Sequence, residues 1–410
     1  MTNGHIARSL AGALFLVLAA AGEAGATPAS AAVALANLEA GTLAAGDAAL
    51  AAIVSRDPAD NDARFGLGAT RFVRAIEHLS QGLYRYGLKT PNSSFMPILR
   101  LPVPDNPRPQ PITYQAFRAI LQGFVDDLAA ANAALAQMSP AEVQLKLDLA
   151  KLRYDADGDG RVGDDERLIA VINKVTGAGL QGPAIVGFDR GDAYWLQGYC
   201  QVLMSFADFL LAYDFQGSFD NTFHLFFPSA RLPLAAALAP PAVATPIGDA
   251  GTIADVNSFI HLVNWPVADA KRMAGIRLRL KDALALSRKS WAAIEAETDD
   301  DHEWIPNPRQ NDSVTGHKVT DLQINAWRGV LDQMDAALDG KALIPHWRLE
   351  KGINLRRVFD EPRPFDLVLW ITGPAALPYL ESGPTMTSAG WRGLTDAFHG
   401  DFATYLVWFN

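Results

Sequence analysis

The chain has 410 residues, of which 49% are hydrophobic and 20% are charged, and its formal net charge is −10. This composition indicates a folded globular protein, with material for one large domain or two to three smaller ones. The acidic balance excludes a general nucleic-acid binder, which needs a basic face. It equally disfavours docking on anionic lipid.

The first 26 residues have the pattern of an export signal peptide. Arg8 supplies a short positive region, residues 9–21 form an apolar stretch, and Ala24-Gly25-Ala26 fits a cleavage site. We therefore expect removal of residues 1–26 and a periplasmic or secreted location. An uncleaved anchor and a buried N-terminal helix are the alternatives. No later segment has the roughly 20 apolar residues that a transmembrane helix needs.

The chain contains one cysteine, Cys200. An exported protein with a single cysteine forms no internal disulfide, so its stability must come from its core and from any bound metal. Cys200 lies in the apolar segment 194–200, which predicts a buried and unreactive thiol.

Apolar residues recur at helical spacing along most of the chain. The helices expected on this basis cover residues 31–55, 63–84, 114–138, 189–213, 269–296 and 321–338. The proline-rich segment 88–112 predicts a loop, because repeated proline interrupts both helices and central strands.

The segment 48–84 resembles a tetratricopeptide-repeat hairpin. The matching residues are Asp57-Pro58, Ala63-Arg64, Gly66-Leu67-Gly68 and Ala75. Small residues at such positions let two helices pack closely. No second copy follows at a 34-residue period, so an isolated helical hairpin explains the pattern equally well.

The predicted fold class is mainly α, because helices and strands do not alternate as in a doubly wound sheet. We expect a helical bundle or a helical-hairpin (TPR-like) architecture with an inserted metal loop and a turn-rich C-terminal region. The expected organisation is an N-terminal helical domain over 27–228, an Ala/Pro-rich linker or loop over 229–252, and a C-terminal helical region over 253–410.

The strongest chemical signal is the twelve-residue segment 155–166, which contains Asp155, Asp157, Asp159, Gly160 and Glu166. Its spacing resembles the calcium loop of the EF-hand family at every diagnostic position. The resemblance implies one bound Ca²⁺, with carboxylate ligands from the three aspartates at positions 1, 3 and 5. Position 6 is a glycine, which permits a sharp turn.

The same resemblance assigns the remaining positions of the loop. Arg161 would supply its backbone carbonyl at position 7, and water would replace a side chain at Gly163. Glu166 would close the site with two oxygens. Val162, at position 8, would pack against a partner loop.

The segments on either side of the loop are apolar. Leu145, Leu149 and Leu152 form one face of a possible incoming helix, and residues 168–175 form an outgoing one. The alternation of Val143, Leu145, Leu147 and Leu149 also allows a strand.

Other acidic segments lack the loop spacing. Residues 57–62 and 189–192 do not match it, and residues 297–303 predict a solvated acidic loop, with a second metal cluster as the alternative. A single loop without an evident partner favours a structural ion over a cooperative sensor.

These patterns leave two classes of function. The first is a non-enzymatic exported protein, stabilised by calcium, that binds a protein or another ligand. The second is a calcium-stabilised hydrolase or carbohydrate-binding protein with a site among C-terminal aromatic and acidic residues, such as His346-Trp347-Arg348. Zinc, phosphate-loop and Rossmann motifs are absent from the sequence.

Overall fold

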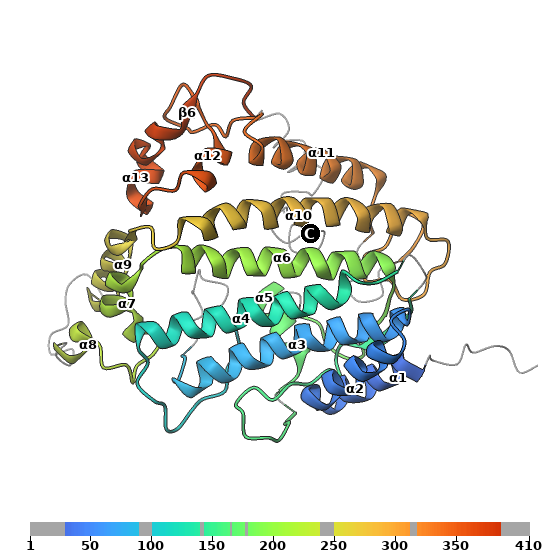
Figure 1. Cartoon of the computed structure of the whole chain (residues 1–410). Helices are drawn as coiled ribbons and strands as arrows, with labels where there is room; N and C mark the ends of the chain where they lie inside the picture. The colour runs from blue at the N-terminus through green and yellow to red at the C-terminus, as the bar shows by residue number, and fades with distance from the viewer. Residues whose placement is uncertain are drawn as a thin grey trace, which may run out of the picture.

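The computed structural model describes residues 29–89, 101–139, 143–164, 166–176, 179–237, 250–311 and 318–386. The expected signal peptide lies outside these ranges. Within them the protein is mainly helical, which confirms the predicted fold class (Figure 1). No described helix combines the length and apolarity needed to cross a membrane.

The longer helices are α1 (Ala29–Ala40), α2 (Leu43–Arg56), α3 (Asn61–Arg85), α4 (Tyr114–Leu135), α5 (Leu168–Thr176), α6 (Arg190–Ala212), α9 (Ala250–Leu262), α10 (Ala270–Ala296) and α11 (Asp321–Leu338). The shorter ones are α7 (Gln216–Thr222), η2 (Phe223–Leu225), α8 (Pro233–Ala237), α12 (Leu355–Asp360), α13 (Leu367–Thr372) and η3 (Pro374–Tyr379). Three antiparallel strand pairs connect them: β1 (Leu145–Asp148) with β2 (Ile185–Phe188), β3 (Asn264–Trp265) with β5 (Phe365–Asp366), and β4 (Gly352–Ile353) with β6 (Leu380–Glu381).

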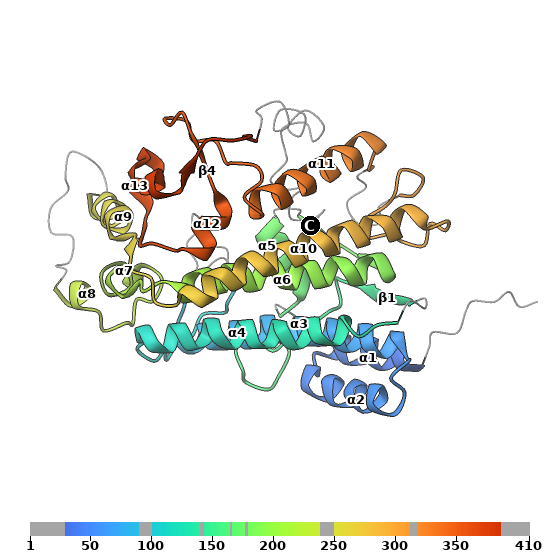
Figure 2. The ribbon, with the colours of Figure 1, turned by 45° about the horizontal axis from the view of Figure 1, so that its top comes forward.

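The long helices stand in a row, each packed on its neighbours. Figures 1 and 2 show the order α2, α3, α4, α6 and α10, with α1 beside α2 and α3. The largest group of contacting buried side chains extends from Ala31 to Ile276 and therefore includes residues on both sides of the segment 229–252. The division into two domains at that segment stays a prediction.

Helix α6 lies in the middle of this row. Its buried positions are distributed around the helix and include Cys200, Met204 and Asp208. Burial raises the pKa of the Cys200 thiol, so the predicted unreactive cysteine is confirmed as a core residue. Asp208 forms ion pairs with Arg272 and Arg279, and these pairs join α6 to α10.

The boundaries of the first helices differ from expectation in two places. Gly41, with φ of +70°, separates α1 from α2 within the segment that we expected to be one helical region. A residue without a Cβ adopts this left-handed turn at no steric cost. Helix α3 begins at Asn61, two residues before the expected start at 63, and its N-terminal cap is Asp60, whose side chain accepts the Ala63 N–H.

Small residues of α3 allow its neighbours to approach closely, as the sequence predicts. A Cβ added to Gly68 would lie 2.5 Å from Leu135 of α4, and one added to Gly66 would lie 2.7 Å from Ala34 of α1. Both distances are shorter than a carbon contact allows. The resemblance to a tetratricopeptide hairpin beyond this packing stays a prediction.

We expect Gly68→Ala to lower the free energy of unfolding by about 1–3 kcal/mol, because the added methyl group forces α3 and α4 apart. Gly123→Ala is the matched control: it lies on the exposed face of α4, where a Cβ meets nothing within 4 Å. That change should raise the free energy by roughly 0.5–1 kcal/mol through helix propensity alone. Urea unfolding measures both, and equal effects would contradict the packing.

Candidate metal centre

The loop 155–166 lies between two strands that pair at its base. Strand β1 precedes the loop, α5 follows it, and β2 then pairs antiparallel with β1, with Leu145 opposite Phe188. The helix expected over residues 145–152 is therefore wrong, and the strand that the alternation allowed is present. Alternating burial explains the outcome, because Leu145 and Leu147 point into the core and Lys146 is exposed.

Directly at the loop, the backbone of Arg153 pairs with that of Arg167 in an antiparallel bridge. The Tyr154 N–H also donates to the Glu166 carbonyl at 3.1 Å. The two ends of the loop are thus held together, and its twelve residues form a closed turn that leads into α5.

The structure brings the three predicted aspartates together. Asp155, Asp157 and Asp159 each place a carboxylate oxygen within 4.8 Å of the other two. Glu166 is not part of this group. Its Oε1 accepts the Ala156 N–H and its Oε2 accepts the Gly163 N–H, both at 2.7 Å, and the residue is buried.

Backbone N–H groups inside the turn fix the orientation of the aspartates. The Asp155 carboxylate accepts the Gly158 and Gly160 N–H groups at 2.7 and 3.0 Å. Gly158 and Gly160 both have φ of +78°, so the predicted sharp turn at Gly160 is present. The Arg161 side chain is exposed. The predicted ligand atom of this residue is its backbone carbonyl oxygen.

Helix α3 supports the beginning of the loop through three side chains on one face. Glu77 Oε2 accepts the Asp155 N–H at 2.8 Å, Gln81 Nε2 donates to the Asp155 carbonyl at 2.8 Å, and Ser80 Oγ donates to the Ala156 carbonyl at 2.9 Å. Sequence reasoning missed this support. These three polar residues stand at positions i, i+3 and i+4 of α3 and therefore share one face of the helix.

Crowding of like charges makes the site suited to a cation. Burial raises the pKa of Asp157, and the neighbouring Asp159 and Asp155 carboxylates raise it further. Two unit charges 4.8 Å apart repel by roughly 3–4 kcal/mol at an effective dielectric of about 20, a figure that water on the exposed side lowers. The side-chain donors are oxygens only, which fits a hard cation such as Ca²⁺.

Val162 packs against the turn between α1 and α2. A Cβ added to Gly41 would lie 2.7 Å from Val162 Cγ2. Position 8 of an EF-hand usually packs against a partner loop, and in this structure the turn at Gly41 takes that contact.

A second carboxylate group forms between segments that are far apart in the sequence. Asp189, Glu297 and Glu303 place oxygens within 4.8 Å of one another. The prediction of a fully solvated acidic loop over 297–303 is wrong for Glu303, which is only 5% exposed. The backbone explains this, because Gly187 of β2 donates to the His302 carbonyl at 2.9 Å and draws the segment inward.

Burial dominates the protonation of this second group. It raises the pKa of Glu303 to about 7, although the Asp301 N–H donates to the carboxylate. Burial and a hydrogen bond with Asp189 also raise the pKa of Glu297. The group therefore retains protons at neutral pH when no cation is bound.

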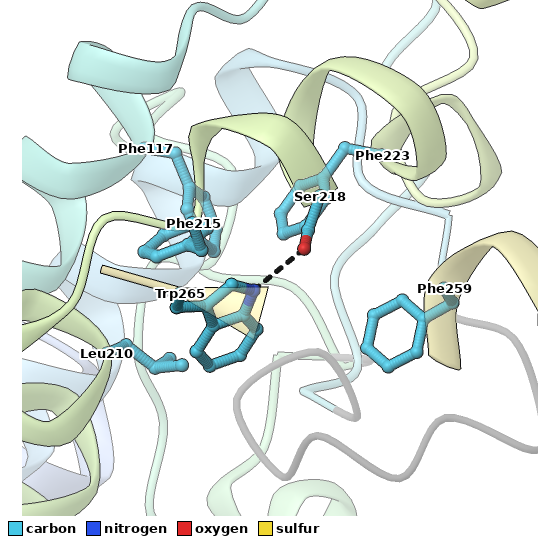
Figure 3. A pocket seen from close by; sticks show the side chains of 7 residues that line it. All are labelled: Phe117, Leu210, Phe215, Ser218, Phe223, Phe259 and Trp265. Atoms are coloured by element: carbon cyan, nitrogen blue, oxygen red, sulfur yellow. Dashed lines mark hydrogen bonds between the residues drawn. The ribbon is translucent and has the colours of Figure 1, made fainter. Parts of the chain in front are cut away.

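Two cavities lie among the described residues. The apolar cavity in Figure 3 has a volume of about 10 Å³, room for one water at most. Its one hydroxyl, Ser218, accepts from Trp265 Nε1 at 2.8 Å and donates to the Leu262 carbonyl at 2.7 Å. A second cavity of about 190 Å³ lies between α4, α6 and α10 and is lined by Arg190 and Lys289 but by no carboxylate.

The C-terminal aromatic residues named as an alternative site lie partly on the surface. Trp347 is 77% exposed, and its Nε1 donates to the Ile371 carbonyl at 3.1 Å. The neighbouring His346 Nε2 lies 3.2 Å from the Trp370 carbonyl. Backbone contacts thus occupy the polar atoms of these rings.

Glu166→Gln should lower the free energy of unfolding in chelator by about 1–3 kcal/mol, because an amide NH₂ would face a buried N–H. Asp164→Asn is the control, since Asp164 is 83% exposed and its ion pairs with Arg153 and Arg167 contribute less than about 1 kcal/mol. Denaturant unfolding of both variants without calcium measures the difference. Equal losses would contradict the hydrogen bonds of Glu166.

Stability in chelator should fall as pH rises from about 4.5 to about 7, the window between the ordinary pKa of Glu303 and its raised value. In that window the folded state keeps a proton that the unfolded state has lost, and each such proton contributes a slope of about 1.4 kcal/mol per pH unit. Glu303→Gln keeps an acceptor for the Asp301 N–H and should lower the slope by one such proton, while Glu297, whose pKa is also raised, keeps its own contribution. An unchanged slope in thermal unfolding would contradict the assignment.

Comparison of the chain with protein-family models, with curated proteins and with solved structures found no match. What the protein does is therefore inferred from its own residues, contacts and charges.

Proposed function

We propose that the loop 155–166 binds one calcium ion, and that this ion stabilises an exported helical protein. The observation that carries the proposal is the convergence of Asp155, Asp157 and Asp159 within 4.8 Å in a loop with EF-hand spacing. A cation would offset the repulsion between these carboxylates, and it would bind to a turn that is already closed at its ends.

The ligand chemistry favours calcium over other metals. Carboxylate and carbonyl oxygens suit hard cations, and a flexible set of six or more oxygens suits Ca²⁺ better than the smaller Mg²⁺. The carbonyl of Arg161 and water near Gly163 would complete this set. Glu166 would join through the lone pairs that its two hydrogen bonds leave available, so its ligand role depends on how the turn closes around the ion.

The contacts of the loop favour a structural role for the ion. Its first two residues are bonded to α3, and its ends are bridged by Arg153 and Arg167. An ion that fixes this turn adds its binding free energy to the stability of the helices beneath it. Calcium at the concentrations found outside cells would suffice for such a site.

The larger task that we propose is protein interaction or ligand binding without catalysis. The proposed location is periplasmic or secreted, from the signal-like pattern of residues 1–26. The cavity of about 190 Å³ beside Arg190 and Lys289 has room for a small ligand. The second class of function, a calcium-stabilised hydrolase, has no observation in its favour among the described residues.

Asp157→Asn tests the proposal, because asparagine keeps the oxygen that accepts the Asp159 N–H and removes one charge. For the unchanged chain we expect about 1 mM calcium to raise the free energy of unfolding by roughly 2.7 kcal/mol over chelator, if Kd is about 10 μM. The variant should be at least as stable in chelator and should gain much less from calcium.

Asp105→Asn is the matched control, since this carboxylate is 82% exposed beside Lys89 and far from the loop in sequence. Its response to calcium should equal that of the unchanged chain. Thermal unfolding with and without calcium gives the comparison. A calcium response that is absent in the unchanged chain would show that the loop binds no ion.

A further inference from the structure

The turn between α1 and α2 takes the place where a partner loop is expected. Val162 packs on Gly41. A Cβ atom added to that glycine would lie 2.7 and 3.0 Å from the two methyl carbons of the valine. Only a glycine leaves room for this contact, and the φ of +70° at Gly41 independently requires one.

A second contact joins the same turn to the entrance of the loop. The Arg153 N–H donates to the Leu38 carbonyl in the last turn of α1 at 3.0 Å. Lys151 Nζ also lies 3.8 Å from a Glu39 oxygen. The α1–α2 hairpin therefore contacts Lys151 and Arg153 before the predicted ligands, and Val162 among them.

We propose that the ion bound in the loop 155–166 controls how firmly the α1–α2 hairpin docks on the rest of the protein. This inference rests on the proposed calcium site and deepens it, because it assigns the regulation of that site. Without the ion, repulsion between Asp155, Asp157 and Asp159 loosens the turn between its bridged ends and weakens the packing of Val162 on Gly41. The hairpin keeps its contacts with α3 and loses its contacts with the loop.

The coupling is reciprocal by thermodynamic necessity. If calcium strengthens docking of the hairpin by a given factor, then docking strengthens calcium binding by the same factor. Because α1 begins at Ala29, cleavage after residue 26 would make this hairpin the N-terminal element of the mature chain. Calcium would then determine whether the start of the mature protein is firmly packed.

Hydrogen exchange of the whole chain, in 1 mM calcium and in chelator, tests the inference, with calorimetric titration of calcium alongside. We expect the ion to slow exchange in α1 and α2 by about tenfold, within the 5–150-fold range of coupled sites. Amides that exchange by local opening away from the loop, such as those of α13, should be unchanged. The middle of α6 and α10 exchanges only on global unfolding and should slow with the overall gain in stability.

The outcomes separate the two proposals. Calcium binding with unchanged exchange in α1 and α2 would overturn the coupling and leave the proposed site intact. Absence of calcium binding would overturn both.

Val162→Ala tests the contact itself, because it removes the two methyl carbons next to Gly41 and keeps the backbone of the loop. We expect it still to bind calcium, while the slowing of exchange in α1 and α2 drops below threefold. Val256→Ala removes the same atoms from an exposed position of α9 and should retain the full tenfold effect. A full effect in both variants would overturn the role of Val162.

Discussion

Burial of α6 is the constraint on which the arrangement of the other elements depends. This helix is buried on several sides, so α4 and α10 must cover it. Its buried Asp208 is stabilised only because Arg272 and Arg279 reach it from α10, since an unpaired buried charge is costly. Strand β2 leads directly into α6, and through β1 it fixes the base of the metal loop.

The loop and the second carboxylate group are therefore connected through one short ladder. One edge of β2 pairs with β1, which enters the loop, while the backbone of its Gly187 meets the acidic segment at His302. A Cβ on Gly187 would lie 2.3 Å from the Asp301 carbonyl oxygen, so only glycine permits this approach. The chain enters the loop from the Asp148 end of this ladder, and it reaches Asp189 from the Phe188 end.

Local signals in the sequence predicted the long helices well. Helix α11 has the predicted bounds, and α4, α6 and α10 differ by one to three residues, because their apolar periodicity and caps are encoded locally. The aspartate positions of the loop were also predictable, since their spacing alone brings them together. The sequence of β1 is compatible with both a helix and a strand, because four residues are too few to distinguish the two periodicities. Pairing with β2 makes it a strand.

Contacts between distant segments were not predictable in the same way. Nothing near Asp189 indicates that Glu297 and Glu303 approach it, because the approach depends on the ladder at Gly187. The polar residues of α3 likewise cannot be recognised as supports of the loop until the fold places the loop against them. For the same reason the sequence does not indicate that Val162 packs against the turn at Gly41.

The site combines ligands that are close in sequence with supports that are remote. The predicted ligands lie within twelve consecutive residues, whereas Glu77 bonds to Asp155 across 78 residues of chain. Closing a short turn costs less conformational entropy than closing a long one. If the proposed ion binds, it could therefore gather the aspartates before α3 packs on the loop. The proposed site would then form early in folding, and its remote supports would be added later.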